Sequence, residues 1–328
     1  MFRPSKKMAA VAAAALMVGV GLLSAAPATA TTTTRVVPVV GTGHYLVYGK
    51  YTPVASGKAT VNLYSLGSDG HTRALGLIKT TTPKSIPATA SGTVLVAPKD
   101  GVENYRWDLT TGARTTIAEQ TVAAPDGYAK IGSNGKTGVD SRSAVVLVTA
   151  AGSTSIGVPF PRGENVDGSI RLQSGSAGVT ITDNNGHIRY IAFANPGVVR
   201  SLHTYNKGGN DASVGCAAFT SVSVACSGFD EDRVTLMGVQ LDGTKFSHTT
   251  AHCVNTPAAL HTAIAWVGCK NRLEVLHSDN SVTTSTTTFG TAKPVSAFGK
   301  VVLQSNTGTS LQTMTRAGSK PATIVPAG

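Results

Sequence analysis

Short runs of β-branched and other apolar residues, and not helical repeats, dominate the chain after residue 30. Hardly any stretch has the 3.6-residue apolar period of an amphipathic helix, whereas alternating or continuous apolar runs recur throughout. The clearest predicted strands are Tyr45–Tyr48, Thr93–Val96, Ala144–Val148, Val179–Thr182, Val222–Ala225, Ala263–Val267 and Val301–Gln304. The pattern predicts an all-β protein.

One kind of turn recurs along the chain. A strand-like run ends in a short turn that contains Gly or Asn, and a second run follows. The turns are marked by Gly70, Gly112, Gly152, Gly186, Gly243, Asn280 and Gly318. Most of them are about 40 residues apart, the length of a four-stranded propeller blade, although the fourth and fifth are farther apart. Seven turns predict a β-propeller with seven blades, and six blades remain an alternative.

The second unit illustrates the predicted blade. Its four strands are expected at Ile86–Ala90, Thr93–Ala97, Tyr105–Leu109 and Arg114–Ala118. One unit alone cannot bury both faces of its sheet, so the units are expected to stack around an axis. A β-sandwich also fits short strands with regular turns, but it does not predict a recurrence near 40 residues.

The segment Tyr105–Arg114 (YRWDLTTGAR) resembles the Asp-Leu-x-Thr-Gly turn of bacterial exported β-propellers of the TolB-like and quinoprotein-like kind. The repeat length matches over all of the chain after residue 30, whereas the turn motif itself occurs in only one or two units. The resemblance implies a single propeller domain over residues 31–328. The quinoprotein pattern places a Trp a few residues after the turn, whereas Thr115, Thr116 and Ile117 follow here, so no cofactor is expected.

The first 30 residues have the pattern of a secretory signal peptide. Arg3, Lys6 and Lys7 precede an uncharged apolar run from Met8 to Ala26, and the segment ends in a small-x-small pattern at Ala30. We therefore predict cleavage after Ala30 and a secreted, extracellular protein. A retained anchor is the alternative, but the run barely reaches the ~18 residues that a spanning helix needs.

The chain is basic, with a formal net charge of +11, three charges of which belong to the predicted signal peptide. A basic surface favours acidic partners. After residue 30, however, the positive charges are scattered and no run of three occurs, so nucleic acid is not an expected partner. No membrane span is expected once the signal peptide is removed.

Four cysteines, Cys216, Cys226, Cys253 and Cys269, fall in two consecutive units. An even number in an exported protein predicts two disulfides. Cross-strand partners within a sheet can meet the Cα limit of about 7 Å, whereas stacked sheets lie about 10 Å apart. We therefore predict the pairs Cys216–Cys226 and Cys253–Cys269. A zinc site is disfavoured because no Cys-x-x-Cys spacing occurs.

The acidic segment Asp230, Glu231 and Asp232 provides the candidate binding residues. It lies between the predicted second and third strands of the fifth unit, on the propeller face that usually carries ligands. Carboxylates in such a loop could bind a cation or a sugar. A solvated loop beside Arg233 is the alternative interpretation.

The sequence gives little support for a metal site or for a catalytic nucleophile. On a strand, His248 and His252 would lie about 13 Å apart, too far to share one metal ion, so no metal site is expected. The segment Ser174–Gly178 lacks the first glycine and the strand–turn–helix context of a nucleophile elbow. No catalytic residue is predicted.

These observations favour a monomeric extracellular binding or scaffold protein that presents propeller loops to a glycan, a cell-wall polymer or a protein partner. The alternative is a glycan-active hydrolase or lyase with carboxylates in the central channel. An enzyme of that kind needs two carboxylates, or a carboxylate and a histidine, within roughly 10 Å in one pocket. A structural envelope protein without a small ligand is a third hypothesis.

Overall fold

The computed structural model describes most of the chain after residue 32. The described residues are 33–54, 58–99, 103–118, 121–132, 144–157, 171–182, 187–204, 214–219, 223–230, 233–240, 242, 244–251 and 256–327. The predicted signal peptide, residues 1–30, lies outside them.

The described residues form seven antiparallel sheets, each built from four consecutive strands. Blade 1 contains β1 (Arg35–Gly41), β2 (Tyr45–Tyr51), β3 (Ala59–Gly67) and β4 (Thr72–Thr80). Blade 2 contains β5 (Thr89–Ser91), β6 (Val94–Pro98), β7 (Glu103–Asp108) and β8 (Arg114–Ala118). Blade 3 contains β9 (Thr121–Ala124), β10 (Gly127–Gly132), β11 (Ala144–Thr149) and β12 (Gly152–Gly157). Blade 4 contains β13 (Arg171–Ser174), β14 (Gly178–Thr182), β15 (His187–Ala192) and β16 (Asn195–Thr204).

The last three blades follow the same order. Blade 5 contains β17 (Val214–Phe219), β18 (Ser223–Asp230), β19 (Arg233–Gln240) and β20 (Lys245–Ala251). Blade 6 contains β21 (Ala258–Ala259), β22 (Ala263–Val267), β23 (Arg272–His277) and β24 (Val282–Thr288). Blade 7 contains β25 (Val295–Ala297), β26 (Lys300–Gln304), β27 (Leu311–Met314) and β28 (Ala322–Val325).

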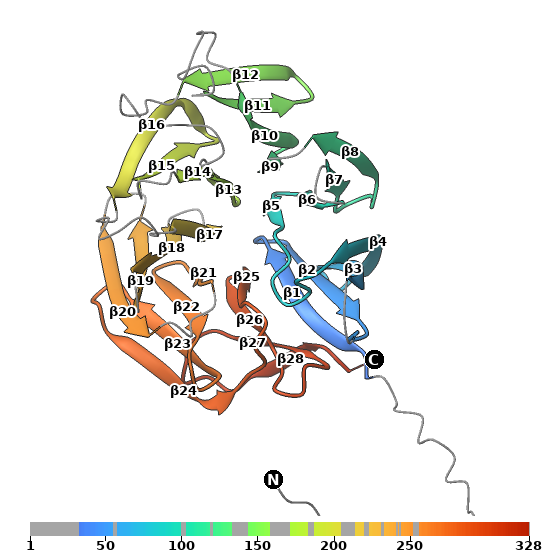
Figure 1. The fold of residues 1–328 in the computed structure, drawn as a ribbon, viewed down its shortest axis with the longest axis vertical. Coiled ribbons are helices and arrows are strands. Elements are labelled where there is room, and N and C mark those ends of the chain that lie inside the picture. The colour runs from blue at the N-terminus through green and yellow to red at the C-terminus, as the bar shows by residue number, and fades with distance from the viewer. Residues whose placement is uncertain are drawn as a thin grey trace, which may run out of the picture. The chain divides into compact units, whose positions relative to one another are not determined.

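The seven sheets form a ring. The first strand of each blade contacts the first strands of both neighbouring blades, and the contact of β1 with β25 closes the circle. Figure 1 shows these first strands innermost, with the fourth strands at the periphery. The prediction of a seven-bladed β-propeller is confirmed. Among the residues described above, no helix is long and apolar enough to cross a membrane.

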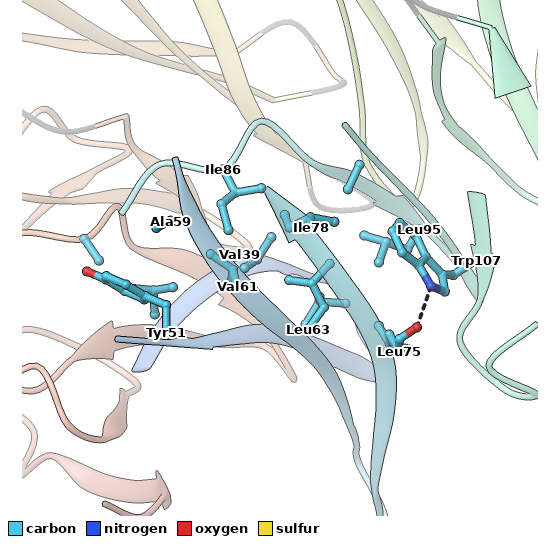
Figure 2. Close-up of a cluster of buried hydrophobic side chains, with 14 of the residues drawn as sticks. Val39, Tyr51, Ala59, Val61, Leu63, Leu75, Ile78, Ile86, Leu95 and Trp107 are labelled. Carbon is cyan, nitrogen blue, oxygen red and sulfur yellow. Dashed lines mark hydrogen bonds between the residues drawn. The ribbon is translucent and has the colours of Figure 1, made fainter. Parts of the chain in front are cut away.

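Side-chain alternation explains how the blades stack. In β3, Ala59, Val61 and Leu63 are buried while Thr60 and Asn62 between them are exposed, as expected when successive side chains of a strand point to opposite faces. The buried face packs against the next blade, in a cluster with Trp107, which is fully buried (Figure 2). Apolar clusters of this kind join neighbouring blades.

Hydrogen bonds link the first blade to the seventh. The Val36 amide donates to the Gly308 carbonyl oxygen at 2.8 Å. Gln304, only 4% exposed, donates from Nε2 to the Val36 carbonyl oxygen at 2.7 Å. The Arg35 guanidinium also donates to the Thr307 carbonyl. Arg35–Gly41 is thus a strand of blade 1, and the ring closes by contacts between two complete blades.

Two expected details of the blades were wrong. The first strand of blade 2 spans Thr89–Ser91 and not Ile86–Ala90, because Pro87 has no amide hydrogen for a sheet, while Ile86 is still buried in the core. The turn marked by Gly186 joins the second and third strands of blade 4, not the third and fourth. The turn between the third and fourth strands lies after Ala192.

Candidate functional site

One end of every blade gathers the same parts of the chain. Because the four strands alternate in direction, the start of the first strand, the end of the second and the start of the third lie at one end of the sheet. We call this end of the ring the entry face. Asp230 is the last residue of β18 and pairs in register with Arg233, the first residue of β19, so the backbone of Asp230 lies at the entry face.

A cavity of about 440 Å³ opens on the entry face around the inner strands. Its size lies within the range typical of small-ligand pockets. Residues from blades 2, 3 and 4 and from the segments before β5, β21 and β25 line it: Ser85, Pro87, Ala88, Thr89, Val96, Pro98, Glu103, Asn104, Thr121, Val122, Leu172, Gln173, Thr256 and Lys293. The lining combines hydroxyl and amide groups with apolar patches, one carboxylate and one ammonium group.

Lys293 lies in the segment that leads from blade 6 into blade 7. Its Nζ donates a hydrogen bond of 3.0 Å to the Ile86 carbonyl oxygen, and its amide donates to the Lys84 carbonyl oxygen at 3.2 Å. Burial lowers the pKa of Lys293 from 10.5 to about 8, because removal from water penalises the charged form. Near neutral pH this side chain is still mostly protonated, so it brings a positive charge into the cavity.

Two serine hydroxyls and one amide oxygen near the inner strands have no hydrogen-bond partner within the described part of the chain. They are Ser91 Oγ at the end of β5, Gln173 Oε1 in β13 and Ser174 Oγ at the end of β13. Gln173 lines the cavity itself. Buried polar atoms are normally satisfied, so an acceptor left unpaired in a cavity indicates a place where a donor from water or a ligand fits.

The carboxylate among the described lining residues, that of Glu103, already forms an ion pair. Glu103 Oε2 lies 2.5 Å from Lys99 Nζ, four residues earlier in the loop between β6 and β7. Other polar lining groups hold blades 2 and 3 together: Asn104 Nδ2 donates to Thr121 Oγ1 at 3.0 Å, and Thr89 Oγ1 accepts from the Ala123 amide at 2.9 Å. These bonds fix the rim of the cavity between the two blades.

A second, smaller cavity of about 30 Å³ shares Thr256 and Lys293 with the first. Its other walls come from the ends of β1 and β13 and the start of β25, and they include Gly41, Ser174 and Ser296. The two cavities follow the inner strands from their beginnings toward their ends. Lys293 lines both cavities.

The acidic segment predicted as a binding site is not among the described residues that line the cavity. Asp230 ends β18, whereas Glu231 and Asp232 lie outside the described residues. Its role as a binding site therefore stays a prediction. His248 lies in β20, where its ring stacks at 6.1 Å on that of Trp266, and His252 lies outside the described residues. Within the described ranges, no group of three His, Cys, Asp or Glu residues is placed to hold a metal ion.

Three of the four cysteines, Cys216, Cys226 and Cys269, lie at or beside hairpins. Cys216 in β17 and Cys226 in β18 are direct partners in the antiparallel register, a position that brings Cα atoms within disulfide range. Cys269 follows β22 and is not a free thiol. Cys253 lies outside the described residues, so both predicted pairs stay predictions.

Sequence reasoning did not select Lys293 or Gln173. Lys293 is an isolated lysine in a Thr-Ala-Lys-Pro segment, and Gln173 is one of several polar residues in a short strand. Neither belongs to a motif. The two residues come to line one cavity only because the ring brings blade 4 close to the segment that leads into blade 7.

No protein-family model and no curated protein matches the chain. Among solved structures, BamB from Moraxella catarrhalis is 14% identical, with a TM-score of 0.42 over 83% of this chain and 82% of that protein. An oligogalacturonate lyase in complex with manganese is 12% identical, with a TM-score of 0.46 over 90% of each chain. A computationally designed protein, Ika8, is 11% identical, with a TM-score of 0.45 over 84% of this chain and 98% of that one. Identities this low assign neither an activity nor a partner to this chain.

Proposed function

We propose that the chain is an exported binding protein that takes a glycan or a cell-wall polymer at the cavity of its entry face. The observation that carries the proposal is the cavity itself, which several blades build together from hydroxyl, amide and apolar groups. Sugars present hydroxyl groups at their edges and apolar faces, and such a mixed lining complements both. An extracellular protein partner, inserting a side chain into the same cavity, is the other outcome that the experiment below distinguishes.

The lining supports binding more directly than catalysis. Glycosidic hydrolysis uses a pair of carboxyl groups, and among the described lining residues the carboxylate is Glu103, which is held by Lys99. We therefore expect the bound glycan to be released unchanged. Appearance of reducing ends would overturn the proposal in favour of a hydrolase or lyase.

The test is retention on a panel of bacterial and plant polysaccharides, with reducing sugar measured in parallel. Ala88→Trp fills the cavity from its rim and should abolish retention, because Ala88 lines the cavity in the loop before β5. Val54→Trp is the matched control, since Val54 is 52% exposed and is not a lining residue. Equal retention of both variants would contradict a cavity site, and retention of no polysaccharide would move the search to protein partners.

Export is part of the same proposal. The protein recovered from the culture medium should begin at Thr31, as N-terminal sequencing would show. A protein that stays with the cells and begins at its first residues would contradict the proposed secretion.

A further inference from the structure

The cavity contains a positive charge to which the described part of the chain offers no partner of opposite charge. Lys293 Nζ has one hydrogen-bond partner, the neutral carbonyl of Ile86, and among the described residues no carboxylate forms an ion pair with it. Lys293 is partly buried. A charge that is removed from water without a partner is costly, and the loss of water strengthens its attraction to an anion. The fold thus keeps an unpaired cation at a residue that lines both cavities.

Neighbouring charged groups do not supply the missing anion. Glu103 lines the same cavity, but its carboxylate contacts Lys99. Lys84, whose carbonyl accepts from the Lys293 amide, sends its own Nζ to Thr291 Oγ1 at 2.8 Å. An anionic group that enters the cavity would therefore meet Lys293 as the available counter-charge.

The second independent feature is the unpaired amide oxygen of Gln173. Oε1 is buried, Gln173 lines the same cavity, and the residues that the structure describes offer Oε1 no hydrogen-bond partner. An oxygen acceptor needs a donor, which a carboxylate or a phosphate does not provide at neutral pH. A hydroxyl group provides such a donor. The two features together call for a ligand that carries an anionic group and hydroxyl groups on the same small unit.

We infer that Lys293 and Gln173 form a subsite for one sugar unit that carries an anionic substituent, with Lys293 binding the anion and Gln173 accepting from a hydroxyl. The inference rests on the proposed binding of a glycan, and it specifies the chemical class of that glycan. The anion is a carboxylate, as in a uronic acid, or a phosphate on a sugar hydroxyl. Both have oxygen atoms that accept charge-assisted hydrogen bonds from an ammonium group.

The experiment compares three ligands with one backbone: cellotriose, its uronic acid form with carboxylates at the sixth carbons, and its 6-phosphate. Dissociation constants are measured by calorimetry at pH 7 with the wild-type mature protein. An acidic form should bind at least tenfold more tightly than cellotriose, and the better of the two identifies the anion. Equal affinity for all three ligands overturns the inference and leaves the proposed glycan binding intact.

Variants separate the two roles. Lys293→Met should remove the preference for the acidic ligands over cellotriose. Gln173→Leu should weaken the binding of all three ligands alike, because each keeps the same ring hydroxyl donors at the second and third carbons. Lys84→Met is the matched control: Lys84 lies nearby, is exposed and is not among the lining residues, so the preference should persist.

The protonation of Lys293 can be measured directly by NMR. With lysines labelled at Cε with carbon-13, the resonance missing from Lys293→Met identifies Lys293, and its titration is followed with and without ligand. A bound anion should raise the pKa of Lys293 above its value in the free protein. A preference for acidic ligands that persists in Lys293→Met, or a pKa that does not change on saturation, overturns the inference. Absence of binding by any of the three ligands, with Ala88→Trp indistinguishable from wild type on the polysaccharide panel, would instead refute the proposed function.

Discussion

The indole Nε1 of Trp107 donates a hydrogen bond of 2.9 Å to the Leu75 carbonyl oxygen (Figure 2). Leu75 is the extra residue of a bulge in β4: Leu63 pairs with Gly76 and Tyr64 pairs with Ala74, so Leu75 has no partner in the ladder. A bulge leaves the extra residue outside the regular hydrogen bonding. The tryptophan of blade 2 thus satisfies a carbonyl that blade 1 leaves unpaired.

Replacing Trp107 by Phe should destabilise the protein by about 2 to 4 kcal/mol. The change removes buried apolar volume and leaves the Leu75 carbonyl without its donor. Urea denaturation of the purified variant measures the loss. Trp266→Phe is the matched control, because Trp266 is also fully buried but its Nε1 has no hydrogen-bond partner in the described part of the chain. A smaller loss is expected there, and equal losses would mean that the Leu75 bond contributes nothing.

Gln304→Leu should weaken the closure of the ring. The buried Nε2 donates to the Val36 carbonyl oxygen, so an apolar replacement leaves that oxygen unpaired between blades 7 and 1. We expect a loss of about 1 to 3 kcal/mol in urea denaturation. Hydrogen exchange should locate the change, with faster exchange of the Val36 amide than in wild type. Unchanged exchange there would show that the closure does not depend on Gln304.

Asp108→Asn should reduce stability near neutral pH, with an effect that fades in acid. Asp108 Oδ1 accepts from the amides of Thr111 and Thr110, and the Thr111 amide is the main reason that the pKa of Asp108 lies below its usual value of 3.8. A lowered pKa means that the charged form stabilises the fold above the unfolded-state pKa and that this contribution is lost as the pH falls through the folded-state pKa. The difference from wild type should be about 1 kcal/mol at pH 6 and smaller at pH 3. A difference independent of pH would contradict this assignment.

Lys293→Met should stabilise the free protein at pH 7, by about 1 to 2 kcal/mol, because it removes a partly buried, unpaired charge at the cost of one hydrogen bond. The pKa of Lys293 is about 8 in the folded state against 10.5 as the ordinary value, so the unfolded chain binds more protons between these pH values. Wild-type stability therefore rises across that window, and the advantage of the variant should shrink from pH 8 upward. Lys84→Met controls for the loss of a lysine, and a constant advantage from pH 7 to pH 9.5 would rule out the charge as its cause.

Disulfide mapping of the oxidised protein should recover the pairs Cys216–Cys226 and Cys253–Cys269. The first follows from their direct pairing in the register of β17 and β18. Peptide mass spectrometry without reduction distinguishes these pairs from the other two connectivities. A peptide that links Cys216 or Cys226 to Cys269 would contradict the prediction.

The repeat could be predicted because its turns are local. Gly112 has a φ of +78° and Gly70 one of +85°, a backbone conformation that favours glycine, and Asp108 and Asp69 bind the amides of their own turns. Such signals can be recognised in a few consecutive residues. Blade 4 shows the limit, because its turn between the third and fourth strands consists of Phe193 and Ala194, which carry no turn signal.

The cavity could not be predicted in the same way. Glu103, Gln173 and Lys293 come from different blades, and no spacing in the sequence relates them. The low pKa of Lys293 depends on burial, which exists only after the ring has formed. The acidic segment at Asp230 attracted attention because charge clusters are visible in a sequence, whereas an isolated lysine in a closed ring is not.

Because every sheet consists of consecutive strands, each blade is complete as soon as its own stretch of chain has been synthesised. The contacts of blade 1 with blade 7, such as that of β1 with β25, form only after blade 7 has been synthesised. Until then, the apolar flank of blade 1 that later meets Val295 and Val302 is uncovered. Exposed apolar surface favours aggregation, so we expect blade 1 to be vulnerable for the whole time that separates its synthesis from that of blade 7.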